Sequence, residues 1–353
     1  MTTLQTPAEA EEFVGKVLTD SSAWLATTLA MIGDRLGLWE KLCDEPVTSG
    51  ELAERSGINE RYAREWLAAM SAHGYLTYDP ATARFELPVA HRPALAEQGG
   101  PMFFGGVHQE MLGLVTVIDQ LIDAFRNGGG VPLSAYGPNF WQGLTRFTAG
   151  GFDHQLLQHW LPAMPDVEAA LERGCAVADI GCGQGRALVR LARAFPASHY
   201  VGYDLYEPSL EAARAHAAES LVDDRVRFER LDASAGLPNS YDLITAFDVV
   251  HDAVNPRGLL QRIRQALKPN GRFVCLDINS SPHLTENAGP VGTFLYGFSV
   301  LFCMPVSLAD HGEGLGTCGF NEQVARELSA EAGFTEVRII PQDDPFHTLY
   351  EIR

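Results

Sequence analysis

A glycine-rich turn at residues 179–185 is the segment of this chain best suited to hold a ligand. It reads Asp-Ile-Gly-Cys-Gly-Gln-Gly and overlaps the end of the apolar run Cys175–Ile180, which predicts a buried strand that ends in a loop before a helix near Arg186. Glycines permit a tight turn and let a ligand approach where a Cβ atom would block it. Asp179, at the strand end, favours a cation or a hydrogen-bond donor in this loop. The spacing G-x-G-x-G differs by one residue from the dinucleotide fingerprint G-x-G-x-x-G.

Acidic residues recur at the ends of the apolar segments that follow this loop. The expected strands are His199–Leu205, Val226–Asp232, Tyr241–Val250 and Gly271–Ile278. Helical patterns lie between them, at Arg186–Phe195, Ser209–Leu221 and Gly258–Leu267. Strands that alternate with helices predict a parallel sheet whose ligands bind at the carboxyl ends of the strands, where the acids lie.

From about residue 172 to the C-terminus the chain resembles the class I S-adenosylmethionine (SAM) dependent methyltransferases. The glycine motif, the acids that end the next two strands and the turn Leu267-Lys-Pro-Asn-Gly-Arg272 stand in the order of that family. Glu336–Pro341 and Phe346–Arg353 resemble its closing antiparallel hairpin. The resemblance implies an α/β fold with a Rossmann-like, seven-stranded methyltransferase sheet.

The resemblance also implies SAM as the cofactor, S-adenosylhomocysteine as its product, and a set of cofactor-binding residues. The glycine motif would hold the methionine part, an acid would bind the ribose hydroxyls, a second acid would bind the adenine amino group, and the end of the fourth strand would lie near the methionine end of the cofactor. Asp179, Gly181 and Gly183 match the glycine motif, and Asp204 matches the acid for the ribose, with Leu205 beside the adenine. Asp232 with Ala233 matches the acid for the adenine amino group, and Phe247 with Asp248 matches the end of the fourth strand.

His251 is the candidate general base, just beyond the expected fourth strand. Its imidazole, with a pKa near ~6.5, can accept the proton of a phenol or a carboxylic acid. The pair His251-Asp252 resembles the His-Asp pair of plant-type small-molecule O-methyltransferases, although Ala253 stands where a Trp usually follows. The alternative is that Asp252 caps the next helix and His251 packs over SAM. The sequence leaves both open.

Length and composition favour an intracellular enzyme of two domains. At 353 residues the chain exceeds one sheet domain of this kind. Its first residues are acidic and show no signal-peptide core, and the apolar stretch Val291–Pro305 is short for a bilayer core of ~30 Å. The cysteines show no C-x-x-C spacing, the histidines are scattered, and His108, His154 and His159 lack partners at ligand spacing. We therefore expect a cytoplasmic protein with reduced cysteines, no membrane association and no metal.

The first part of the chain, residues 1–98, has the pattern of a winged helix. A long amphipathic helix is expected over Ser21–Leu42, and Asn59 is placed to cap a helix over Glu60–His73. A shorter helix precedes the second one, and the pair Tyr75–Tyr78 and Arg84–Leu87 would form the β-wing. This order predicts a mainly α winged-helix domain in front of the methyltransferase domain at 172–353.

Two uses of the winged helix are open, DNA binding or dimerisation. Bacterial relatives with this domain order are often described as transcriptional regulators. DNA affinity, however, comes largely from Lys and Arg, and this chain has 26 basic against 45 acidic residues, a net charge of −19. The candidate recognition helix offers Arg61, Arg64 and His73, offset by Glu60 and Glu65. We therefore expect a homodimer through the N-terminal helices and no DNA binding.

The segment 99–171 is expected to be a helical linker that contributes to the acceptor pocket. A helix is expected over Met111–Phe125, and the candidate acceptor-binding residues are Trp141, Phe294 and Phe298. These aromatic residues favour a small, hydrophobic or aromatic methyl acceptor, although ordinary core packing is the alternative for each. The sequence thus predicts a small-molecule methyltransferase, with O-methylation favoured because of His251. The alternatives are a SAM-responsive winged-helix regulator that binds DNA and a SAM sensor without chemistry.

Overall fold

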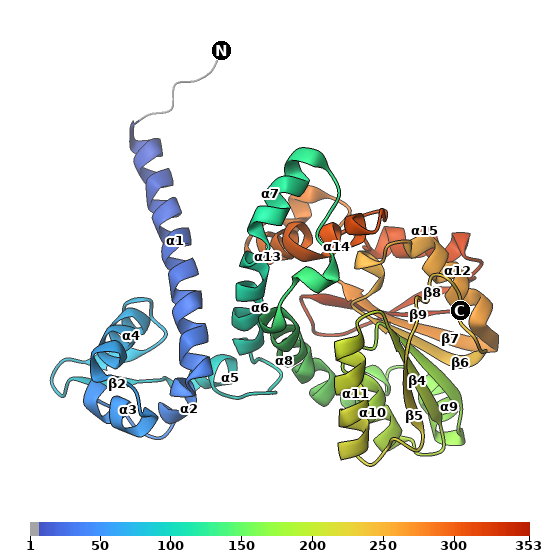
Figure 1. Cartoon of the computed structure of the whole chain (residues 1–353), viewed down its shortest axis with the longest axis horizontal. Helices are drawn as coiled ribbons and strands as arrows, with labels where there is room; N and C mark the ends of the chain where they lie inside the picture. Colours follow the sequence, from blue (N-terminus) through green and yellow to red (C-terminus); the bar gives the residue numbers. More distant parts are fainter. Residues whose placement is uncertain (1–6) are drawn as a thin grey trace. The chain divides into compact units, whose positions relative to one another are not determined.

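The computed structural model describes residues 7–353, in two compact units (Figure 1). One unit contains the chain up to Gly113 together with Pro138–Gly150, and the other contains Leu114–Gly137 with Gly151–Arg353. The segment 99–171 is thus divided between the two units. The first six residues, where the expected domain 1–98 and the acidic N-terminus begin, lie outside the described residues.

The second unit is built on a seven-stranded sheet with the order β5-β4-β3-β6-β7-β9-β8. The first five strands along the chain pair in parallel, and β9 pairs antiparallel with both β7 and β8. This confirms the Rossmann-like methyltransferase sheet and its closing hairpin. The strands are β3 (Ala176–Ile180), β4 (His199–Asp204), β5 (Val226–Arg230), β6 (Tyr241–Phe247), β7 (Leu267–Ile278), β8 (Val337–Ile340) and β9 (His347–Ile352).

Strand side chains alternate between two hydrophobic cores, one on each face of this sheet. In β3, Val177 belongs to one core and Ala178 to the other, because successive residues of a strand point to opposite faces. The first core contains apolar residues of three helices, α9 (Pro165–Arg173), α10 (Arg186–Ala194) and α11 (Glu207–Glu219). The second contains those of α12 (Pro256–Ala266) and α15 (Glu322–Glu331). Helices therefore cover both faces of the sheet (Figure 1).

The first unit contains the winged helix that the sequence predicts. Thr48 caps α3 (Ser49–Ser56) through a capping box with Glu51, and Asn59 caps α4 (Glu60–Ala72). The wing strands β1 (Thr77–Asp79) and β2 (Arg84–Glu86) pair antiparallel.

The long N-terminal helix differs from the expected Ser21–Leu42. Helix α1 spans Pro7–Arg35, and a separate short helix, α2, spans Leu38–Lys41. The break falls at Gly37, whose φ of 62° is left-handed and therefore ends the helix.

The remaining helices come from the middle of the chain and from the segment after β7. The expected helix Met111–Phe125 is two helices, α6 (Gly105–Val115) and α7 (Ile118–Asn127). The others are α5 (Arg92–Leu95), α8 (Pro138–His154), α13 (Pro290–Phe298) and α14 (Met304–Ala309), with π-helical turns η3 (Leu156–Trp160) and η6 (Ser299–Cys303) and 3-10 turns η1 (Val89–His91), η2 (Leu133–Ala135), η4 (Val250–Asp252) and η5 (Leu284–Asn287).

Helix α13, turn η6 and helix α14 run on as one helical stretch, Pro290–Ala309. With 20 residues and a mean hydropathy of 1.7, it is long and apolar enough to cross a membrane. The length of Val291–Pro305 is therefore not an argument against a membrane span, because the helical stretch to which it belongs is longer. Of its most apolar window, 44% is buried inside the protein, and core helices meet the same criteria of length and composition.

Candidate functional site

The glycine loop between β3 and α10 leaves open space beside its backbone. Gly183 has a φ of 51°, and a Cβ atom added there would meet no heavy atom within 4 Å. At Gly185, with a φ of 72°, a Cβ atom would lie 2.4 Å from the Phe228 ring. Protein packing therefore explains Gly185, whereas Gly183 lines a free surface that a ligand can approach closely.

Asp204 lies at the end of β4 and binds this loop. Its two carboxylate oxygens accept the backbone N–H groups of Gly183 and Tyr206, each at 2.8 Å. Burial raises the pKa of Asp204, and these hydrogen bonds work against that rise. Leu205, the next residue, is 45% exposed although apolar. An acid beside an exposed apolar side chain fits a ribose with its base.

Asp179 is buried at the end of β3. Its Oδ1 accepts the hydroxyl of Thr245 on the neighbouring strand β6, at 2.6 Å. Burial raises the pKa of Asp179 to about 7, although the Thr245 hydrogen bond works in the opposite direction. A nearby cationic ligand would favour the ionised carboxylate.

Asp232 and Ala233 follow β5 in a short turn. Asp232 Oδ1 accepts the backbone N–H of Ser234 at 2.9 Å and its hydroxyl at 2.6 Å, and Ala233 is buried. These bonds fix the carboxylate at the carboxyl end of its strand, on the same sheet edge as Asp204.

Phe247 and Asp248 end β6, where the resemblance places the methyl donor. The Phe247 ring packs with Trp160, with the ring centroids 6.0 Å apart. Asp248 has a left-handed φ of 57°, and its Oδ1 is buried with no hydrogen-bond partner in residues 7–353. Its Oδ2 lies 3.4 Å from Nε2 of His347. Burial would lower the pKa of His347, but the carboxylates of Asp248 and Asp344 raise it to about 10.

His251 is held by Asp277 and not by its neighbour in sequence. Its Nδ1 lies 2.8 Å from Oδ1 of Asp277, on the adjacent strand β7, and both side chains are buried. Burial alone would lower the pKa of His251, but the Asp277 carboxylate holds it well above its ordinary value. Because Nδ1 is engaged, Nε2 is the ring atom that can exchange a proton with another group. Asp277 is thus the hydrogen-bond partner of His251, and Asp252 is its neighbour in sequence.

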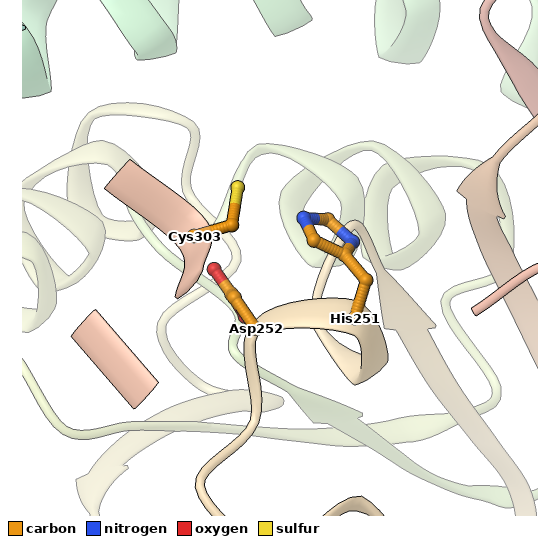
Figure 2. A group of neighbouring side chains, drawn as sticks. All are labelled: His251, Asp252 and Cys303. Atoms are coloured by element: carbon orange, nitrogen blue, oxygen red, sulfur yellow. The ribbon is translucent and has the colours of Figure 1, made fainter. Parts of the chain in front are cut away.

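Asp252 and Cys303 lie on the other side of the His251 ring, where the three side chains point toward one another (Figure 2). One ligand atom from each lies within 4.8 Å of the other two. Cys303 belongs to the π-turn η6, a local irregularity that is frequent at functional sites. Ligand spacing along the sequence does not reveal this group, because its members come from distant parts of the chain.

The candidate acceptor residues belong to both units. Phe294 and Phe298, on α13, are half-buried and pack together with ring centroids 4.6 Å apart. Phe294 also contacts Phe346, just before β9, at 5.9 Å. Trp141, on α8 of the first unit, is half-buried against Phe140 at 5.1 Å. The structure thus brings Phe294 and Phe298 together in the second unit.

Three site residues were missed by the sequence analysis. Asp277 lies near the carboxyl end of a strand, so the rule that selected Asp204 could have selected it too. Thr245 and Cys303 carry no comparable signal, because only the pairing of β3 with β6 and the turn η6 reveal their neighbours.

Comparison with known proteins places two family models on the chain. Residues 171–293 match the model described as "Methyltransferase domain", and residues 24–97 match the "Rv2258c-like winged HTH domain".

Similar proteins include several O-methyltransferases. The ubiquinone biosynthesis O-methyltransferase of Roseobacter denitrificans is 31% identical over 156 residues, which are 44% of this chain and 58% of that protein. The chain thus spans little more than half of that relative. The acetylserotonin O-methyltransferase of Mus musculus molossinus is 25% identical over 94% of this chain and 86% of that protein. The structure of human N-acetylserotonin methyltransferase in complex with SAM matches with a TM-score of 0.69 at 16% identity, covering 99% of each chain.

Proposed function

We propose that this chain, which belongs to the class I methyltransferases with an N-terminal winged-helix domain, transfers the methyl group of SAM to a small hydrophobic or aromatic acceptor. An oxygen atom is the favoured acceptor atom. The observation that carries the proposal is the shared sheet edge: the open glycine loop, Asp204 and the buried pair of His251 and Asp277 all lie at the carboxyl ends of neighbouring strands.

SAM as the cofactor is supported by the loop and by the two acids next to it. Gly183 leaves room for the ligand, Asp204 can receive ribose hydroxyls, and Asp179 favours a cation such as the sulfonium or the ammonium group of SAM. The SAM complex of the human N-acetylserotonin methyltransferase agrees with this assignment. S-adenosylhomocysteine would be the product.

The chemistry is an in-line displacement on a sulfonium methyl group, for which a positioned nucleophile and exclusion of water are the main requirements. The displacement itself needs no metal ion. The acceptor oxygen attacks the methyl carbon, the C–S bond breaks, and the proton of the hydroxyl goes to Nε2 of His251 in its neutral form, whose own proton lies on Nδ1 toward Asp277. Asp277 orients the ring and stabilises the imidazolium that forms.

A hydrophobic acceptor is supported by the aromatic residues of the helical stretch that follows β7. Phe294 and Phe298 are half-buried on α13, and Trp141 on α8 is also half-buried. The acidic net charge of −19 speaks against an anionic acceptor and against nucleic acid as the substrate.

Dimerisation is the use of the N-terminal unit that we favour over DNA binding. On the candidate recognition helix α4, Arg61 pairs with Glu65 at 2.5 Å and Arg64 with Glu60 at 2.7 Å, so both cations are already neutralised. The competing function, a SAM-responsive regulator, would require the protein to shift its own upstream DNA at moderate salt. We propose a cytoplasmic homodimer that is not associated with a membrane.

The first experiment combines methyl-labelled SAM with the purified protein and a lysate of the source cell, separated into small molecules, protein and nucleic acid. We expect label in the small-molecule fraction, and we expect His251→Ala to lower turnover by about 10²–10⁴-fold without changing SAM affinity. Tight SAM binding without any transfer would favour the regulator. Undiminished turnover of His251→Ala would show that His251 is not the general base.

A further inference from the structure

We infer that His251, Asp252 and Cys303 form a binding site for a divalent transition-metal ion of the zinc class, and that a bound ion inhibits the protein by occupying Nε2 of His251. The first half of this inference concerns metal binding and is independent of catalysis. The second half rests on the proposed methyl transfer.

The three side chains supply the donor atoms that zinc prefers. An imidazole nitrogen, a carboxylate oxygen and a thiol sulfur lie within 4.8 Å of one another (Figure 2). Zinc binds such atoms at about 2.0–2.3 Å, which places neighbouring ligand atoms roughly 3.3–3.7 Å apart in a tetrahedral site. The ligand atoms therefore need to approach one another by about 1 Å. Three protein ligands leave a fourth position for water.

His251 is already oriented as a metal-bound histidine would be. Metal-ligating histidines almost always donate their other ring N–H to a carboxylate or a carbonyl group. Here Nδ1 lies 2.8 Å from Asp277 Oδ1, and the other oxygen of Asp277 accepts the backbone N–H of Val250 at 3.2 Å. With the proton on Nδ1, the lone pair of Nε2 points away from Asp277 and is available to a metal.

Cys303 and Asp252 can supply negative charge to the same ion. The hydroxyl of Thr317 donates to Cys303 Sγ at 3.0 Å, which favours the thiolate, whereas burial raises the pKa of this thiol, so a bound cation would be needed to ionise it. The carboxylate of Asp252 accepts none of the hydrogen bonds found among residues 7–353. Two carboxylates and a thiolate around one imidazole would leave a negative site, whose charge a divalent cation balances.

Metal binding and proton transfer exclude one another at this site. Both need the lone pair of His251 Nε2, so a bound ion would remove the proposed base. The expected result is a methyltransferase that zinc inhibits and a chelator restores.

The binding half is tested with Co²⁺ as the probe, because a thiolate ligand gives cobalt a charge-transfer absorption in the near ultraviolet. We expect one Co²⁺ per chain with this absorption in the full-length protein, and the same in Cys43→Ser, which removes a thiol of the other unit. Cys303→Ser should lose the absorption. The site is refuted by a wild-type protein without the absorption, or by a Cys303→Ser variant that retains it.

Two further variants keep the test decisive if Cys303→Ser does not fold. Asp252→Asn removes a charged ligand at nearly constant volume, and Asp277→Asn replaces the carboxylate that faces His251 Nδ1 with a neutral amide. Each should weaken Co²⁺ binding by about 10–100-fold. Thermal unfolding without metal identifies variants that are not folded, and unchanged Co²⁺ affinity in both folded variants would overturn the site.

The inhibition half is tested by titrating Zn²⁺ into the methyl-transfer assay at saturating SAM. Zinc should inhibit the wild-type protein and Cys43→Ser at the same concentration, and inhibition of Asp252→Asn, relative to its own metal-free rate, should require at least about tenfold more. Metal binding without inhibition of the wild type would refute this half alone. If no methyl transfer is found, the cobalt absorption still decides the site.

Discussion

The carboxylate of Asp204 accepts the backbone N–H of Gly183 at 2.8 Å, and it thereby ties the end of β4 to the glycine loop that follows β3. Its other oxygen is bound to the backbone N–H of Tyr206. One carboxylate thus shapes the loop, and it is the group that we propose for the ribose of SAM. Removing it should affect both the loop and the ligand.

Asp204→Ala should reduce SAM affinity by about 10–100-fold or more, because each hydrogen bond to a charged group contributes about 1.5–3 kcal/mol. Asp204→Asn should lose less, since its amide oxygen can still accept one backbone N–H. Isothermal titration calorimetry measures both, with the exposed Asp223→Ala as the control. SAM affinity unchanged in Asp204→Ala would show that the cofactor is bound elsewhere.

The buried Asp179 makes stability depend on pH in a defined direction. Its pKa of about 7 in the folded protein lies above the ordinary aspartate value of 3.8, so the folded protein holds this proton more tightly than the unfolded chain does. The ionised carboxylate therefore destabilises the fold, and this cost grows as the pH rises from about 4 to 7 and is constant above that. SAM, as a cation, should offset it.

Asp179→Asn should therefore stabilise the ligand-free protein at pH 8, by about 1–3 kcal/mol, since one unit of pKa shift corresponds to about 1.4 kcal/mol. At pH 4 the variant and the wild type should be nearly equally stable. Urea unfolding at both pH values measures this difference, and calorimetry should show weaker SAM binding by the variant. A stability difference that does not change with pH would contradict the raised pKa.

The sequence predicts the sheet well because its strands are buried on both faces and end in acids. Val177 and Ala178 face different cores, so both must be apolar, and the whole run is recognisable as a strand. The hydrogen-bond partner of His251 could not be read from the sequence, because only the pairing of β6 with β7 places Asp277 beside the imidazole. Cys303 could not be predicted, because a π-turn shifts the helical register that a sequence pattern assumes.

The first unit has an ion pair whose carboxylate is buried, and breaking this pair should destabilise the unit. Arg146, on α8, donates two hydrogen bonds of 2.7 Å to the carboxylate of Asp34, on α1, whose side chain is 3% exposed. Asp34→Ala would leave the Arg146 guanidinium without its carboxylate and with Gln109 Oε1 as an acceptor, and we expect a loss of about 1.5–3 kcal/mol in the free energy of unfolding.

Urea unfolding, with hydrogen exchange of α1 and α8 to locate the effect, measures this loss. Lys16→Ala, which breaks an exposed pair with Asp20 on the same helix, should leave stability nearly unchanged. An equally small effect of Asp34→Ala would mean that water replaces the ion pair.

Large apolar side chains are exposed along α1 and carry the proposed dimer. Leu18, Leu25 and Ile32 recur every seven residues, which is the spacing at which a helix presents one stripe to a partner helix. Leu18 is 70% and Leu25 57% exposed. A row of this kind is unusual on a surface that meets only water. The double variant Leu18→Glu, Leu25→Glu should therefore be monomeric, because it would bring four carboxylates into a two-fold interface.

Multi-angle light scattering gives the mass directly, and we expect a dimer for the wild type and a monomer for the double variant. Leu221→Glu changes a leucine of the second unit that is 82% exposed, and it should remain a dimer. SAM affinity should stay the same in the double variant, because the cofactor residues belong to the other unit. A double variant that remains dimeric would place the interface on another surface of the chain. A wild-type protein that is monomeric at all concentrations would show that the chain does not dimerise.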